Sequence, residues 1–298
     1  MAATRTHETE QTEPRRKVRV GLLGHGISAS RTPRMHIDEG RAQGLVYDYQ
    51  LYDMAGEDAE PEMGALLSRL EVEGLNGLNV TFPYKQHVIP YLDELSDAAT
   101  AVEAVNTVVF RNGRRHGHNT DFWGFGESFN RGLPGVVRDR VLLLGAGGAG
   151  GAVANALLDR GVGQLLLHDR VHEAAERLAR QLGDRFGADR ATTVVDLTEA
   201  AGSVDGIVNS TPMGMDKLPG MAIAADVIEP RHWVADIVYF PLETELLATA
   251  RAKGCRVLSG AGMAVFQAVR AFELFTGLKA DPDRMRKTFD SFTAEAGA

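Results

Sequence analysis

Short strand-like runs alternate with helical patterns along the first part of the chain. Strands are predicted where apolar and β-branched residues alternate or run together, and helices where apolar residues recur every three or four positions. The predicted strands span residues 17–23, 47–52, 77–80 and 107–110, and the predicted helices span 33–44, 62–71, 84–92 and 97–102. The pair Asn112-Gly113 predicts a hairpin turn after the last of these strands.

A second alternating series begins at Val141. Its predicted strands span residues 141–144, 164–168, 192–195, 206–209, 233–237 and 256–258, and its predicted helices span 149–160, 172–182, 246–253 and 263–276. Gly132, Pro134 and Gly135 mark a linker between the two series, within residues 121–140. Repeated alternation of strand and helix is typical of α/β proteins built on parallel sheets.

Composition narrows the class of protein. The 298 residues are enough for two ordinary domains, and 44% hydrophobic with 24% charged residues is the balance of a globular chain. A net charge of −8 argues against nucleic acid and anionic membranes as partners. The single cysteine, Cys255, excludes a disulfide framework and a Cys-rich zinc site, and the histidines show no ligand spacing, so no metal is expected.

Neither residues 1–16 nor the most apolar stretch of the chain resembles a targeting or membrane segment. Residues 1–16 are polar and mixed in charge, which predicts a disordered tail rather than a secretory signal. Residues 141–158 are broken by five glycines and Asn155, so they do not read as a membrane span. The expected location is the cytoplasm.

The strongest motif is a glycine-rich loop between the strand at 141–144 and the next helix. Gly145, Gly147 and Gly150 meet the spacing G-x-G-x-x-G, in which glycines permit a tight turn, close approach to a pyrophosphate, and close helix–strand packing. The helix N-terminus then faces the phosphate charge. The loop residues predicted to bind a dinucleotide are Gly145, Ala146, Gly147, Gly148 and Ala149.

Asp169 and Arg170 bear on the choice of dinucleotide. Asp169 ends the second strand of this series, 24 residues after Gly145, where a carboxylate would accept hydrogen bonds from both ribose hydroxyls and repel a 2′-phosphate. Arg170 could instead pair with that phosphate. A plain turn or N-cap role for Asp169 is the structural alternative. We expect NAD, with NADP less favoured.

These patterns predict two units with a cleft between them. Residues 17–120 and 264–298 would form an open α/β substrate-binding and catalytic unit, and residues 121–263 a doubly wound, Rossmann-type dinucleotide-binding unit. Small hydroxyls and amides gather at predicted strand ends, in residues 30–33, 79–85, 104–107 and 117–121. Ligands of open α/β sheets bind at the carboxyl ends of strands, and this mixture suits a polyhydroxylated substrate.

Seven motifs resemble the shikimate/quinate dehydrogenase family, from about Arg19 to Gly277. They are GLNVTFPYK (77–85), AVNT (104–107), GHNTDFWGF (117–125), LLGAGGAG (143–150), NSTPMGM (209–215), DIVYFPLET (236–244) and GMAVFQA (262–268). The resemblance implies a catalytic pair formed by Lys85 and Asp121. It also implies roles around a cyclic carboxylate substrate and its cofactor: Asn106, Thr81 and Gln267 on the substrate hydroxyls, Ser30 and Thr32 on its carboxylate, Tyr239 lining the cleft, and Thr211 and Gly262 at the cofactor.

The implied pair suits the chemistry. Oxidation of a secondary alcohol by hydride transfer requires removal of the hydroxyl proton, which a positioned Lys amine can accept as general base. Asp121 would orient Lys85 and the hydroxyl, and the residues leave open which of the two takes the proton.

Two departures from the biosynthetic pattern affect the expected specificity. Thr32 replaces the second serine of the usual S-x-S-P motif, as in quinate-accepting members. NADP-using members usually carry the cluster N-R-T…R after the second strand of the cofactor unit, whereas this chain has Asp169-Arg170-Val171 and, at the position of the later arginine, Ala174. The prediction is an NAD-dependent oxidoreductase interconverting quinate or shikimate with the 3-dehydro ketone, at the C3 hydroxyl, as a monomer or homodimer. The alternatives are a biosynthetic NADP-dependent shikimate dehydrogenase, an aminoshikimate-type dehydrogenase and a non-catalytic ligand sensor.

Overall fold

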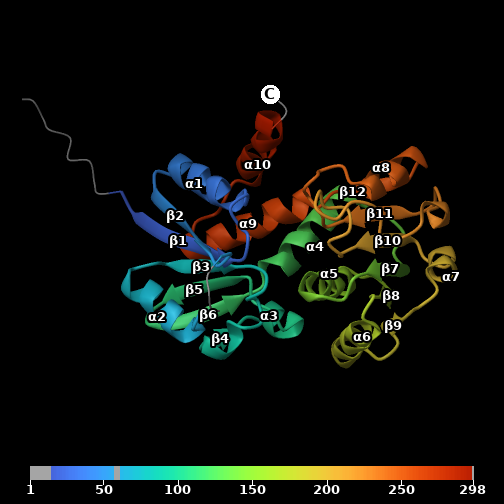
Figure 1. Cartoon of the computed structure of the whole chain (residues 1–298), viewed down its shortest axis with the longest axis horizontal. Coiled ribbons are helices and arrows are strands. Elements are labelled where there is room, and N and C mark those ends of the chain that lie inside the picture. The colour runs from blue at the N-terminus through green and yellow to red at the C-terminus, as the bar shows by residue number, and fades with distance from the viewer. Residues whose placement is uncertain (1–14, 57–60, 297–298) are drawn as a thin grey trace, which may run out of the picture.

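Two six-stranded sheets lie side by side in the computed structural model, which describes residues 15–56 and 61–296 (Figure 1). Residues 1–14 of the predicted tail lie outside the described residues. The first sheet and its helices comprise β1 (Lys17–Gly24), α1 (Thr32–Ala42), β2 (Val46–Asp53), α2 (Met63–Val72), β3 (Gly77–Val80), η1 (Ile89–Tyr91), β4 (Glu94–Leu95), α3 (Asp97–Val102), β5 (Thr107–Arg111) and β6 (Arg114–His118).

The first sheet is mixed rather than wholly parallel. Its strand order is β2-β1-β3-β5-β6-β4, with β1 parallel to β2 and β3, and β5 antiparallel to β3 and β6. The predicted hairpin joins β5 to β6, and Asn112 and Gly113 both take positive φ angles, 54° and 69°, as a two-residue turn of this kind requires. The hairpin reverses the chain and leads it into the next helix, α4.

The second sheet is wholly parallel, in the order β12-β11-β10-β7-β8-β9. This is the doubly wound order of dinucleotide-binding folds, which confirms the predicted fold class. The remaining elements of the chain are α4 (Thr120–Gly132), β7 (Arg140–Leu144), α5 (Gly148–Asp159), β8 (Gln164–His168), α6 (His172–Phe186), β9 (Ala191–Thr193), α7 (Leu197–Gly202), β10 (Gly206–Asn209), η2 (Ala225–Val227), β11 (Trp233–Asp236), α8 (Glu245–Ala252), β12 (Arg256–Leu258), α9 (Ala261–Thr276) and α10 (Pro282–Ala296).

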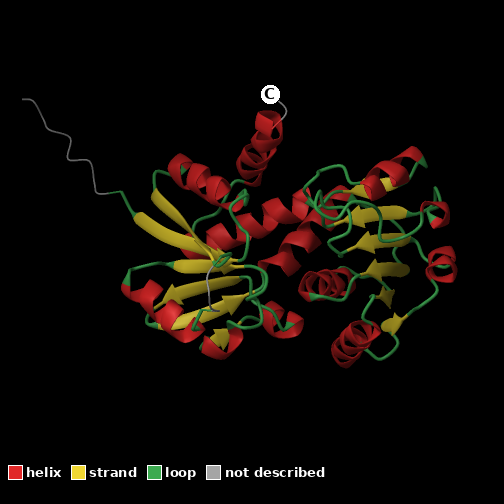
Figure 2. Ribbon diagram, viewed as in Figure 1, coloured by secondary structure: helices red, strands yellow, loops and turns green. Residues whose placement is uncertain are grey.

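Helices cover both faces of this second sheet, as Figure 2 shows. In β7, Val141 and Leu143 pack into one apolar cluster, while Leu142 and Leu144 pack into the cluster on the other face. A strand buried on both sides needs apolar residues at every position, which explains its continuous apolar run. The arrowheads in Figure 2 point toward the first sheet, so the carboxyl ends of these strands face it.

Helices α4 and α9 run between the two sheets (Figure 1) and pack closely against each other. A Cβ at Gly124 would lie 2.7 Å from the backbone nitrogen of Gln267, and one at Gly262 would collide with the Ser128 side chain. Glycine on both helices therefore permits this close crossing, which fixes Asp121 on α4 relative to Gln267 on α9.

One predicted element is wrong, and six elements have no predicted range. Residues 84–92 form turns and the short 3₁₀ segment η1 instead of an α-helix, because Pro90 has no N–H and disfavours helical geometry at Ile89. The elements without a predicted range are α4, β4, β6, α7, η2 and α10, and α4 occupies the first half of the predicted boundary region 121–140. In the described part of the chain, every helix is too short or too polar to cross a membrane.

Candidate active site

Lys85 and Asp121 meet where the first sheet adjoins α4. Lys85 lies in the turn that follows β3, and Asp121 lies in the first turn of α4, whose N-cap Asn119 accepts a hydrogen bond from the Phe122 N–H. Lys85 Nζ donates to Asp121 Oδ2 at 2.6 Å, and the two side chains are 22% and 12% exposed. The sequence separates these residues by 36 positions, and the structure pairs them directly.

A buried hydrogen-bond network holds Asn106 beside this pair. Asn106 Oδ1 accepts from the Thr120 N–H at 2.7 Å and from Thr107 Oγ1 at 3.2 Å, and its Nδ2 donates to Thr120 Oγ1 at 3.0 Å. Asn79 Nδ2 donates to Thr107 Oγ1 at 3.0 Å, and Tyr49 OH donates to Asn79 Oδ1 at 2.8 Å. The network joins β2, β3, β5 and the start of α4, and therefore fixes the position of the Asn106 amide.

The segment that carries Ser30 and Thr32 follows β1 and is folded by Asp53 at the end of β2. The Asp53 carboxylate accepts hydrogen bonds from the backbone N–H groups of Gly26 and Ile27, at 2.7 and 2.9 Å. These bonds, together with one from Ala55, hold the pKa of Asp53 below its usual value. Ser30 Oγ accepts from the Thr32 N–H at 3.4 Å, so the two hydroxyl residues lie together at the start of α1.

Thr81 packs against the end of β1. A Cβ at Gly24 would collide with the methyl group of Thr81, and the Thr81 N–H donates to the carbonyl of Leu23 at 2.8 Å. Glycine at position 24 thus lets the segment after β3 approach the segment that leads to Ser30.

Tyr239 reaches this group from the other unit, in the segment after β11. Burial in the surrounding protein and the negative charge of Asp121 raise its pKa, while the positive charges of Lys85 and Arg31 act in the opposite direction. Its side chain is 41% exposed, so it is both close to these charges and open to solvent on one side. Gln267 lies half-buried on α9, where its Nε2 donates to the carbonyl of Ala264 at 3.1 Å.

The glycine loop has the geometry of a phosphate-binding turn. Gly145 takes a φ of +98°, and a Cβ at Gly150 would collide with the carbonyl of Gly145, so strand and helix approach closely there. A Cβ at Gly147 or Gly148 would point into open space in the part of the chain that the structure describes. Gly147 is the N-cap of α5 and offers no side chain to cover the helix N-terminus. These residues fit a dinucleotide pyrophosphate.

Asp169 and Arg170 follow β8 beside this loop. Asp169 Oδ2 accepts from the Ala146 N–H at 2.7 Å, and Oδ1 accepts from the Val171 N–H at 2.8 Å, so the carboxylate is fixed against the glycine loop. Arg170 is exposed.

A second buried network lies at the ends of β10 and β11. Thr211 donates from N and Oγ1 to Asn209 Oδ1, at 3.1 and 2.7 Å, and Asn209 Nδ2 donates to Asp236 Oδ1 at 2.9 Å. Asp236 also accepts from Thr244 Oγ1 at 2.7 Å and from the Val238 N–H at 3.0 Å. It therefore joins the segment carrying Thr211 to the segment carrying Tyr239. Burial raises the pKa of Asp236 to about 6, against the opposing effect of these hydrogen bonds.

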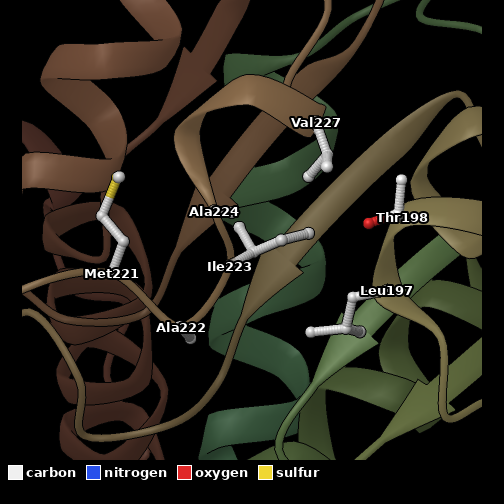
Figure 3. Close-up of a pocket in the computed structure, with 7 residues that line it drawn as sticks. All are labelled: Leu197, Thr198, Met221, Ala222, Ile223, Ala224 and Val227. Carbon is white, nitrogen blue, oxygen red and sulfur yellow. The ribbon is translucent and has the colours of Figure 1, made fainter.

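A surface pocket lies elsewhere, at α7 and the segment around η2 (Figure 3). Its volume is about 380 Å³, and it is lined by Leu197, Thr198, Met221, Ala222, Ile223, Ala224 and Val227. It contains none of the predicted site residues and no titratable side chain. Within the described ranges, no group of three or more His, Cys, Asp or Glu side chains could hold a metal ion.

The arrangement defines a class of enzyme. A parallel dinucleotide-binding sheet presents its glycine loop toward a first unit that holds an amine–carboxylate pair amid hydroxyl and amide side chains. An amine paired with a carboxylate can exchange a proton with a substrate hydroxyl, and a dinucleotide held at the glycine loop can exchange a hydride with the adjacent carbon. The fold and site are those of a nicotinamide-dependent alcohol dehydrogenase.

Comparisons identify the family. Residues 22–108 match the shikimate dehydrogenase substrate-binding domain, residues 129–216 match the shikimate/quinate 5-dehydrogenase model, and residues 260–288 match the shikimate 5′-dehydrogenase C-terminal domain. The shikimate dehydrogenase (NADP⁺) of Streptomyces avermitilis is 50% identical over 91% of this chain and 94% of its own length. The quinate/shikimate dehydrogenase (NAD⁺) of Corynebacterium glutamicum is 47% identical over 91% of this chain and 97% of its own length.

A solved structure agrees with these matches. Quinate dehydrogenase from Corynebacterium glutamicum in complex with NAD superposes with a TM-score of 0.88 at 45% identity, over 92% of this chain and 99% of the other. The chain belongs to the shikimate/quinate dehydrogenase family, and it is an oxidoreductase that uses a nicotinamide dinucleotide.

The structure brings several of the predicted site residues together and adds others. Lys85 contacts Asp121, and Asn106 lies in the network beside Asp121's neighbour Thr120. Gly262 has a packing role against Ser128, and its contact with a cofactor stays a prediction. Sequence reasoning assigned no role to Asn79, Thr107, Asp236 or Arg31. Three of these lie in motifs that it quoted, and their partners become apparent only when distant strands are placed side by side.

Proposed function

We propose that this chain is an NAD-dependent dehydrogenase that acts on quinate and shikimate and interconverts the C3 hydroxyl with a ketone. The observation that carries the proposal is the 2.6 Å contact between Lys85 Nζ and Asp121 Oδ2, placed among polar side chains that face the second unit. Thr32, in place of the second serine of the biosynthetic motif, supports acceptance of quinate as well as shikimate.

The chemistry divides between cofactor and protein. A nicotinamide dinucleotide held at the glycine loop would supply the hydride acceptor for the carbinol carbon. The Lys85–Asp121 pair takes the hydroxyl proton as the ketone forms and returns it in the reverse direction. Asp121 also holds the Lys85 ammonium through a charge-assisted hydrogen bond, so the amine stays at one position relative to the substrate.

The remaining side chains orient the ring. Asn106, Thr81 and Gln267 bind its other hydroxyls, the hydroxyls of Ser30 and Thr32 bind its carboxylate, and Tyr239 closes the cleft from the second unit. The Asn106 amide is well suited to this role because its network leaves it little freedom to rotate.

We assign residues 17–120 and 264–298 to the substrate unit and residues 121–263 to the cofactor unit. Gly145, Ala146, Gly147, Gly148 and Ala149 would hold the pyrophosphate of the cofactor, and Thr211 and Gly262 would hold its nicotinamide end. Asp169 supports NAD because its fixed carboxylate would accept hydrogen bonds from the adenosine ribose and would repel a 2′-phosphate.

Two observations favour a second candidate, an NADP-dependent shikimate dehydrogenase. A relative with that name is as similar to this chain as the relative named for NAD, and the exposed Arg170 side chain lies next to Asp169, where a cation could pair with a 2′-phosphate.

Calorimetric titration of NAD and of NADP separates these candidates. The proposal predicts tighter binding of NAD to the natural protein, by about tenfold or more, since repulsion of roughly 1.4 kcal/mol already gives that ratio. Asp169→Ala should weaken the binding of NAD and reduce the preference for NAD over NADP. The control Arg170→Ala should leave NAD binding unchanged. Tighter binding of NADP, lost in Arg170→Ala, would establish the second candidate instead.

A further inference from the structure

Arg31 lies between the two proposed carboxylate-binding residues, and its side chain is buried rather than directed into solvent. The residue is 6% exposed. Its guanidinium carbon is 4.7 Å from the ring centroid of Phe289, 5.3 Å from that of Phe292 and 5.4 Å from that of Phe240. We call these three phenylalanines the aromatic cage. A guanidinium at these distances from ring faces gains cation–π attraction.

The cage joins three parts of the chain that lie far apart in sequence. Arg31 precedes α1 in the first unit, Phe240 follows β11 in the second, and Phe289 and Phe292 lie on α10. Figure 1 shows α10 next to α1. Arg31 Nη1 also donates to the carbonyl oxygen of Phe289 at 3.1 Å, which fixes the guanidinium on α10. Because Phe240 belongs to the second unit, this one side chain contacts residues of both units.

The charge of Arg31 reaches the proposed substrate site. Burial lowers the pKa of Arg31, while its electrostatic interactions with the Tyr239 hydroxyl and the Asp290 carboxylate act in the opposite direction. Tyr239 is the residue before Phe240, and its ring centroid is 6.0 Å from that of Phe289. Since an arginine stays charged in proteins, the cage holds a fixed cation between Tyr239 and the segment carrying Ser30 and Thr32.

We propose that Arg31 is a positioning residue for the substrate. Held by the aromatic cage, it fixes the Ser30–Thr32 segment and the Tyr239 segment relative to each other, and so determines affinity for the carboxylate-bearing ring without touching the reacting atoms. The assignment rests on the proposed function, because it uses the proposed roles of Ser30, Thr32 and Tyr239.

Steady-state kinetics of Arg31→Met and Phe240→Leu test this role. Met keeps much of the length and apolar character of arginine but has no charge, and Leu keeps apolar bulk but has no ring. Each variant should raise KM for quinate about tenfold, as loss of one desolvated cation–π contact allows. The kcat and the KM for NAD should stay within about twofold of the natural values, because the proposal gives neither residue a contact with the reacting atoms or with the cofactor. The double variant should be no worse than the poorer single variant, because both changes remove the same contact.

Two further variants separate positioning from general stability. Arg34→Met is the matched control, because the guanidinium carbon of Arg34 also lies over a ring of α10, 5.2 Å from the ring centroid of Phe292. It should leave KM for quinate unchanged. Arg31→Lys should give an intermediate KM, because it restores the charge but not the planar face. If Arg31→Met fails to fold, Arg31→Lys and Phe240→Leu decide the question.

The outcomes are distinguishable. If the natural protein turns over neither quinate nor shikimate, the proposed function fails and this assignment fails with it. If the natural protein is active and the variants show a lower melting temperature with unchanged KM, or if KM for NAD rises as much as KM for quinate, the proposed function stands and the positioning role of Arg31 is refuted.

Discussion

Asp236 provides a pH-dependent test of the structure, because it is a carboxylate buried at the junction of two site segments. It is 2% exposed and accepts hydrogen bonds from Asn209, Thr244 and the Val238 backbone. Desolvation raises its pKa to about 6, from an ordinary value of 3.8. The proposed perturbation is Asp236→Asn, which preserves size and removes the titration.

The sign and size of the effect follow from linkage. Because the folded-state pKa lies above the unfolded value, the contribution of this group to stability is fully present below about pH 4 and is lost as the pH rises through about 6. The shift corresponds to about 3 kcal/mol in total, at about 1.4 kcal/mol per pKa unit. About 2 kcal/mol of this falls between pH 4.5 and pH 7.5 when the two titrations are integrated.

Urea unfolding of the natural protein and of Asp236→Asn, at constant ionic strength from pH 4.5 to 7.5, measures this contribution. Other carboxylates titrate in both proteins, so the quantity of interest is the difference in free energy of unfolding at each pH. The natural protein should lose about 2 kcal/mol relative to the variant as the pH rises across this range. A difference independent of pH, or one of opposite sign, would show that Asp236 is not a desolvated carboxylate with a raised pKa.

The other predictions concern the proton-transfer pair, the glycine loop and the wall of the cleft. Lys85→Met should lower kcat by about 10²–10⁴-fold, the usual contribution of a general base, with the Kd for NAD unchanged by calorimetry; retention of most activity would refute its role. Gly150→Ala should lower the stability of the protein without cofactor by about 1–3 kcal/mol, because the new methyl group meets the Gly145 carbonyl; Gly148→Ala, which points into open space, is its control in thermal melts. Tyr239→Phe should raise KM for the substrate with little change in melting temperature. An unchanged KM would refute the proposed role of the Tyr239 hydroxyl at the substrate.

Local pattern was sufficient for much of the fold. The strands at 77–80, 164–168, 206–209 and 256–258 have the predicted bounds, because each is a short apolar run between turn residues. The helix predicted at 84–92 failed at Pro90, whose effect on the preceding turn outweighs the apolar spacing. Helix α10 was not predicted, although its first turn has a capping residue. The Asp281 side chain accepts hydrogen bonds from the backbone N–H groups of Asp283 and Arg284.

The site was predicted less completely, for a physical reason. Motifs name residues such as Lys85 and Asp121, but they do not specify what holds them. The side chains that fix Asn106 come from strands β2, β3 and β5, and the cage around Arg31 includes Phe240 and Phe289, more than 200 residues away in the chain. Such contacts depend on the order of strands in the sheet and on how the helices pack, and the spacing of apolar residues along the sequence does not determine either.

The central claim is that the Lys85–Asp121 site oxidises quinate and shikimate with NAD. The most direct test is kcat/KM for quinate and for shikimate, each measured with NAD and with NADP, on the natural protein. The account predicts turnover of both substrates with NAD, and lower kcat/KM, by about tenfold or more, with NADP. Turnover of shikimate alone with a preference for NADP, or no turnover of either substrate, would contradict it.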